Sequence, residues 1–92
     1  MTRLVLTPED DAAARLRKAD GPAVTAMVLP GRDPLALAAA RAAVEVVAVE
    51  RAADVRVNAV LAGASASPAA VEAIVAYLAG AHAVTGQWLE VA

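Results

Sequence analysis

Apolar runs alternate with amphipathic stretches along this chain, and most of the changes are marked by a proline or a glycine. The near-continuous apolar runs at 23–29 and 55–61 are typical of central parallel strands, which are buried on both faces. Shorter runs at 3–6 and 87–91 indicate two further strands. Because helical patterns separate these runs, the order predicts an α/β fold with a parallel sheet.

Each predicted helix begins with a capping residue followed by proline. The three pairs are Thr7-Pro8, Asp33-Pro34 and Ser67-Pro68. Short polar side chains accept hydrogen bonds from the free amides of a first turn, and proline is well tolerated at the first helical position. We therefore expect helices from Pro8 to about 20, from Pro34 to about Ala53, and from Pro68 to 79, with Gly80 as the stop.

The second predicted helix is apolar on two sides. One side carries Leu37, Val44 and Val47, and another carries Val46, Val49 and Ala53. A helix that is apolar on two sides is normally buried on two sides. We expect the first set to pack on the sheet and the second set to contact a partner chain.

Composition favours one small domain, residues 1–92, with unusually apolar surface. The chain has 92 residues, of which 60% are hydrophobic, and its mean hydropathy is +0.57. Such a domain must expose apolar surface or bury it against a partner. Its apolar runs are too short to span a membrane, and Glu9, Asp10 and Asp11 come too early for a signal peptide, so we expect a cytoplasmic location.

Charge and side-chain chemistry exclude several classes of function. A net charge of −2, a pI near 5.2 and only Tyr77 and Trp88 for stacking argue against nucleic acid as a partner. The chain has no cysteine for a disulfide or thiolate site. Its one histidine, His82, cannot form a zinc site alone and is interpreted as a surface turn residue.

Residues 56–60 (RVNAV) and 84–87 (VTGQ) carry a family resemblance, together with residues 42–45 (AAVE). In this order and spacing they resemble the C-terminal half of short-chain dehydrogenase/reductases (SDRs). The resemblance implies a truncated Rossmann-like domain, with four parallel strands in the order 1-2-3-4 and three helices. It also implies a left-handed last crossover, which would put the third helix on the opposite face of the sheet.

The places of the family's chemistry hold unsuitable residues. On the same alignment Leu37 and Arg41 stand where the catalytic YxxxK has tyrosine and lysine, and Val28 and Leu29 end the strand that carries the serine. Leucine has no proton to give, and arginine remains a fixed positive charge. No glycine-rich phosphate-binding turn occurs before Gly21. We therefore expect no oxidoreductase activity, no catalytic residues and no bound cofactor or metal.

Several polar positions have two interpretations. Ser67 lies in the place of the family's nicotinamide-contacting threonine, but it also suits a helix cap. Arg41 is either an anion-binding charge or a helix arginine that is solvated or paired with Asp33 or Glu45. Asn58, in mid-strand, is expected to be a structural hydrogen-bonding residue, as the resemblance implies.

Two positions bear on a contact with another chain. Glu45, Glu50 and Arg51 form either the solvent edge of the second helix or the polar rim of a dimer contact. Trp88 is either a plug in the core or an anchor in an interface.

Two functions remain open, with a third possibility beside them. The first is a non-catalytic SDR-like subunit that associates with itself or with a full-length SDR reductase, as a homo-oligomer or a heteromer. Its predicted interface residues are Val46, Val49, Ala53 and Trp88. The alternative is a small-molecule-binding domain or minimal enzyme with a pocket at the carboxyl ends of the strands, formed by Asp33, Arg41 and Ser67. A decayed fragment without a selected role is the third.

Overall fold

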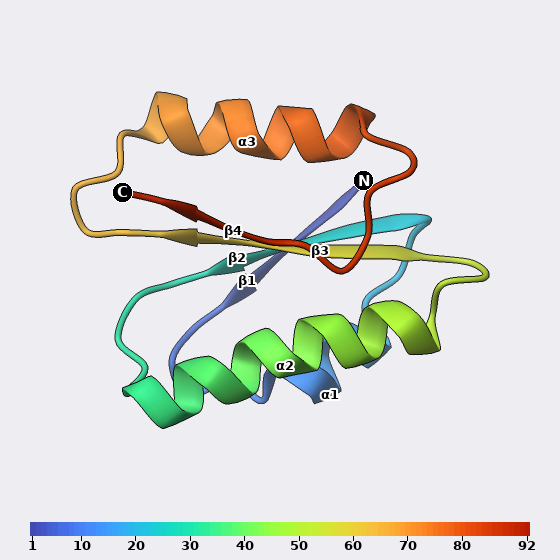
Figure 1. The fold of residues 1–92 in the computed structure, drawn as a ribbon, viewed down its shortest axis with the longest axis horizontal. Coiled ribbons are helices and arrows are strands. Elements are labelled where there is room, and N and C mark those ends of the chain that lie inside the picture. Colours follow the sequence, from blue (N-terminus) through green and yellow to red (C-terminus); the bar gives the residue numbers. More distant parts are fainter.

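A computed structural model describes residues 1–92 as one parallel sheet between two helical layers (Figure 1). The strands are β1 (Thr2–Leu6), β2 (Ala23–Val28), β3 (Arg56–Ala62) and β4 (Trp88–Val91). They are parallel throughout and lie in the order β1-β2-β3-β4. The predicted sheet and strand order are confirmed.

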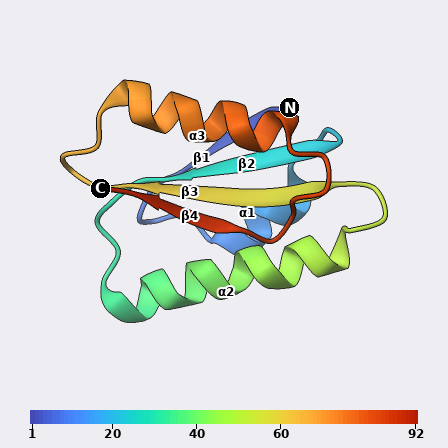
Figure 2. The ribbon, with the colours of Figure 1, turned by 45° about the horizontal axis from the view of Figure 1, so that its top comes forward.

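The helices cover the two faces unequally. They are α1 (Ala12–Lys18), α2 (Pro34–Glu50) and α3 (Pro68–Gly80). Figures 1 and 2 show α1 and α2 on one face and α3 alone on the other. Right-handed crossovers in this strand order would put every helix on one face, so the connection through α3 has the opposite hand. The left-handed last crossover is thus as the family resemblance implies.

Two hydrophobic clusters follow from this arrangement. The larger lies between the sheet and the α1–α2 layer, and its largest fully buried side chains are Leu6, Leu16, Val24, Val28, Val44, Val47 and Val57. The smaller lies under α3 and contains Val60, Val75 and Leu78. Each such side chain stabilises the fold by about 1.5–3 kcal/mol relative to exposure. Most of the burial therefore holds α1 and α2 to the sheet.

Helix α1 does not begin at Pro8, so that prediction is wrong. The Asp10 carboxylate accepts from the Thr7 amide at 2.7 Å, and the Asp10 amide donates to the Thr7 carbonyl at 3.1 Å. These bonds close a separate turn, in which Thr7 cannot act as a cap. Asp11 is the cap instead, since its side chain accepts from the Ala14 amide at 3.1 Å.

The other two caps are confirmed. Asp33 Oδ1 accepts from the Ala36 amide at 2.8 Å, and Ser67 Oγ accepts from the Ala70 amide at 3.1 Å. The predicted helix ends are less accurate. Helix α2 ends at Glu50, because residues 51–54 form turns. Gly80 is the last residue of α3 and lacks the positive φ of a left-handed glycine stop.

None of the three helices combines the length and the apolar character that crossing a bilayer requires.

Candidate functional site

Leu29 and Leu37, which align with the family's catalytic serine and tyrosine, lie near each other at the carboxyl ends of β2 and β3. Leu29, Leu37 and Leu61 line one hollow there, of about 240 Å³. The geometry thus agrees with the alignment that assigned these places. Both places are aliphatic, so neither can exchange a proton with a substrate carbonyl.

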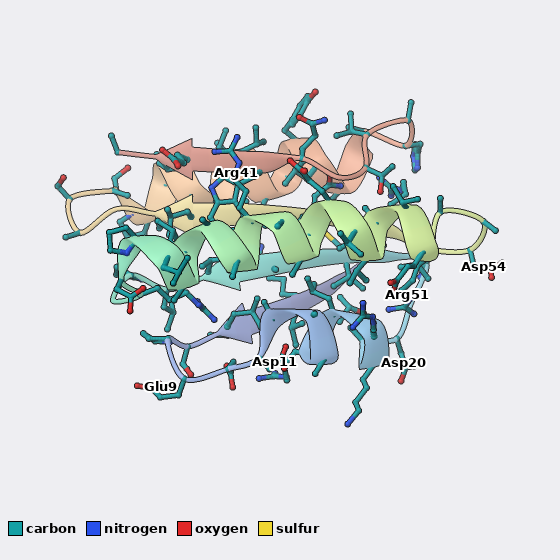
Figure 3. All side chains as sticks on the ribbon, turned by 60° about the horizontal axis from the view of Figure 1, so that its bottom comes forward. Glu9, Asp11, Asp20, Arg41, Arg51 and Asp54 are labelled. Atoms are coloured by element: carbon teal, nitrogen blue, oxygen red, sulfur yellow. The ribbon has the colours of Figure 1, made fainter.

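Arg41 lies one turn further along α2, on its β4 side (Figure 3). It lines a neighbouring hollow of about 260 Å³ with Trp88 and Glu90. Its side chain is exposed, and none of the ion pairs of the chain includes it. Arg41 is therefore a solvated helix arginine in this structure, and the predicted pairing with Asp33 or Glu45 is not formed.

The three residues of the predicted pocket do not share a cavity. Asp33 and Ser67 begin helices on opposite faces of the sheet, and each uses a side-chain oxygen in its cap. Neither lines the hollow that contains Arg41. Ser67 therefore has the capping role, which its sequence context also predicted.

Asn58 is a structural hydrogen-bonding residue, as predicted. Only 2% of it is exposed. Its amide nitrogen donates to the Val84 carbonyl at 3.0 Å, and its amide oxygen accepts from the Gln87 amide at 3.0 Å. Both groups of the side chain hold the turn that leads into β4.

The outward side of α2 is an exposed apolar stripe. Leu35 is 82% exposed, Val49 79% and Val46 50%, whereas Val44 and Val47 on the inner side are fully buried. The other exposed positions between these large residues are the alanines Ala38, Ala39 and Ala42 and the charged residues Arg41 and Glu45. We call Leu35, Ala39, Ala42, Val46, Val49 and Ala53 the α2 stripe. No other element of the chain covers it (Figure 3).

The predicted interface residues divide between this stripe and the sheet edge. Val46 and Val49 lie on α2, and Ala53 is exposed in the turn that follows it. Trp88 is partly buried against the larger core, and its indole N–H lies 3.4 Å from Glu90 Oε1. Trp88 therefore contributes to the core at the edge of the sheet. Val46 and Val49 do not pack against the core.

Sequence reasoning missed Leu35, Ala39 and Ala42. Their signal was present, because the stripe residues are spaced alternately by four and three positions. This spacing is that of a helix seam that packs against another helix.

An alanine-lined hollow of about 340 Å³ lies beside the stripe, between α1 and α2. It is lined by Ala12, Ala13, Ala36, Ala39, Ala40 and Ala43, together with Pro8, Asp10, Asp11 and Arg32. Arg32 donates from Nη2 to the Asp10 carbonyl at 3.0 Å, and its Nη1 is buried without a partner. We call this the alanine hollow.

Glu50 and Arg51 belong to the contact between α1 and α2. Arg17 of α1 donates to both carboxylate oxygens of Glu50, at 2.8 and 2.9 Å, and this pairing lowers the pKa of Glu50. Arg51 donates to the Leu16 carbonyl at 2.6 Å. Only Glu45 of the predicted charged strip remains free of such contacts, beside the stripe.

The fold and these places define a Rossmann-like α/β domain. A family model described as short chain dehydrogenase-like protein matches residues 6–91, and the chain belongs to this family. Comparisons with curated proteins and with solved structures gave no match.

The residues at the strand ends do not fit the nicotinamide cofactor that such a fold implies. The hollow at Leu29 and Leu37 offers aliphatic side chains where hydride transfer needs a proton donor. The cationic Arg41 shares its own hollow with Glu90, whose carboxylate would compete with a phosphate for the guanidinium.

Proposed function

We propose that this chain is a non-catalytic, short chain dehydrogenase-like subunit that acts by associating with another protein chain. The contact surface is the α2 stripe, and the partner is a second copy or a full-length reductase of the family. One observation carries the proposal: Leu35, Val46 and Val49 are half to four-fifths exposed on a single side of one helix. Contiguous apolar surface of this kind marks interaction sites.

The chemistry of the strand ends supports a non-catalytic role. Leu37 replaces the family's acid/base, and Leu29 lies beside it with no hydroxyl. These positions lie together without the reactive groups, which fits a domain that uses the family scaffold for binding.

The stripe is strong enough to matter energetically. Burying the exposed fractions of Leu35, Val46 and Val49 would contribute about 3–6 kcal/mol for one face. Association costs about 4–15 kcal/mol in lost freedom. One face alone does not offset that cost, so the partner must contribute a comparable apolar face of its own.

The test combines a charged variant with a matched control. Val46→Asp puts a carboxylate into the stripe, and Ala73→Asp puts one on the exposed side of α3. We expect light scattering to show an assembly for the wild type and for Ala73→Asp, and its loss in Val46→Asp. Equal assembly by all three proteins would contradict the assignment of the contact to α2.

A second measurement tests the non-catalytic part. Calorimetric titration with NADPH should give no single-site binding in the micromolar range. Micromolar binding at one site, with turnover of a carbonyl substrate, would overturn the proposal.

A further inference from the structure

Arg41 is the only arginine of this chain whose guanidinium has no partner. All the others are engaged: Arg3, Arg15 and Arg17 pair with carboxylates, and Arg32, Arg51 and Arg56 donate to backbone carbonyls. A guanidinium offers a planar fork of N–H donors that matches a carboxylate. The whole of this donor fork is therefore available to a ligand at Arg41.

The hollow at Arg41 is a groove between α2 and the edge strand β4. Pro34, Leu37, Ala38 and Arg41 line it from α2, and Trp88 and Glu90 line it from β4. Because Trp88 and Glu90 are two positions apart on a strand, their side chains lie on the same face of the sheet. The volume of about 260 Å³ is below the roughly 300–1,000 Å³ of pockets that hold drug-sized molecules, so the groove suits a smaller ligand.

Glu90 brings a carboxylate of opposite charge into the same hollow. It forms no ion pair with Arg41, and its only hydrogen bond is the long one of 3.4 Å from the Trp88 indole. A ligand with a negative charge alone would be repelled by Glu90, and one with a positive charge alone would be repelled by Arg41. A zwitterion suits both, because its carboxylate can bind the guanidinium while its ammonium binds the carboxylate.

The rest of the hollow is apolar. Leu37 lines it beside the half-buried side chain of Trp88. Leu37 also lines the neighbouring hollow with Leu29 and Leu61, so the two hollows adjoin at this side chain. An aliphatic group of the ligand can therefore pack on Leu37 and Trp88, and its removal from water favours binding.

We infer that the groove between α2 and β4 binds a free α-amino acid with an aliphatic side chain. The carboxylate of the ligand lies on Arg41, its ammonium lies on Glu90, and its side chain packs on Leu37 and Trp88. No residue of the α2 stripe lines this hollow, so binding here does not depend on association through α2.

Probes of one shape and different charge test whether both ends are recognised. L-Leucine is the zwitterion, isocaproate keeps only its carboxylate, and isoamylamine keeps only its ammonium. Trp88 is the only tryptophan and lines the hollow, so its fluorescence and its indole NMR signal report on binding. We expect leucine to change both saturably, with a dissociation constant on the order of 1 mM at neutral pH. Each single-charge probe should bind at least about threefold more weakly.

Charge-removing variants assign each end of the ligand. Arg41→Gln removes the partner of the carboxylate and Glu90→Gln that of the ammonium, and both positions are exposed, so the domain should stay folded. Each variant should weaken leucine binding by about threefold or more. The matched control is Glu45→Gln, which removes a neighbouring unpaired carboxylate outside this hollow and should leave leucine binding unchanged.

The specificity of the variants gives a further readout that a merely structural role would not change. In Arg41→Gln the advantage of leucine over isoamylamine should disappear, and in Glu90→Gln the advantage of leucine over isocaproate should disappear. Equally tight binding of isocaproate and leucine to the wild type would overturn the inference, because Arg41 would then be a simple anion site. The absence of a saturable change in either Trp88 signal with leucine on the order of 10 mM would also overturn it. Neither result would affect the proposed association, which is tested separately with Val46→Asp.

Discussion

Removal of the Asn58 side chain should destabilise the fold more than its small volume suggests. Asn58→Ala leaves two backbone groups without a partner, the Val84 carbonyl and the Gln87 amide. Both belong to the turn that leads into β4, which is an edge strand of only four residues. The change therefore weakens the attachment of β4 to β3.

The magnitude follows from the two lost hydrogen bonds. An unsatisfied buried polar group costs about 1–3 kcal/mol. Gln87 is exposed and water can replace its lost partner in part, so we expect a total of about 2–4 kcal/mol. A domain of this size has about 5–14 kcal/mol of stability in all, of which this loss is a large share.

Urea unfolding followed by Trp88 fluorescence measures the loss, because Trp88 is the only tryptophan and begins β4. The midpoint should fall by about 2 M. Thr25→Val is the matched control, since Thr25 is as buried as Asn58 and faces it in register, but its hydroxyl contacts only the Met1 sulfur at 3.2 Å. Its cost should stay below about 1 kcal/mol, because a thioether sulfur is only a weak hydrogen-bond acceptor. An Asn58→Ala loss no larger than that of Thr25→Val would refute the reasoning.

Three further predictions concern the core, a turn and pH. Val47→Asp buries a carboxylate under α2 and should abolish the folded circular dichroism spectrum, at a cost above about 4 kcal/mol, whereas Val46→Asp should stay folded. Gly31→Ala forces a side chain to φ +124 with its Cβ 2.8 Å from Pro8 Cγ and should cost about 1–3 kcal/mol in urea titrations. Gly80→Ala has open space and should be neutral or stabilising, so a similar loss in both would contradict that account. The Arg3 guanidinium lowers the pKa of Glu72, so this pair stabilises the fold above the ordinary glutamate pKa and less as pH falls through the lowered value. As the pH falls from about 5 to about 3, the Glu72→Gln variant should lose less stability than the wild type. If stability depended on pH in the same way in both proteins, the result would argue against a stabilising Arg3–Glu72 pair.

The strand order could be predicted because the signals involved are local and strong. The apolar runs at β2 and β3 are continuous, whereas a half-exposed strand would alternate apolar and polar residues. The VTGQ segment, through the family resemblance, indicated that β4 lies beside β3. The start of α1 could not be predicted in the same way. Asp10 and Asp11 could each cap the helix. Asp11 does so because the Asp10 carboxylate already accepts a hydrogen bond from the Thr7 amide.

The predicted pocket shows a different limit. Asp33 and Ser67 both follow the carboxyl end of a strand, which suggests a common site. The opposite hand of the last crossover separates them, because it carries α3 and its cap to the other face. The stripe could be predicted in part, since the two faces of α2 were distinct in the sequence. Which residues remain exposed depends on the packing of α1 and the sheet, so Leu35 became evident only from its exposure.

Methyl NMR on dilution tests the central claim that the chain associates through α2. Val46 and Val5 are matched probes, because each is 50% exposed, one on the α2 stripe and the other on β1. We predict that the Val46 and Val49 methyl signals shift with protein concentration between the micromolar and high-micromolar range, while those of Val5 stay fixed. Signals of Val46 and Val49 that do not change with concentration, or a shift confined to Val5, would contradict the account.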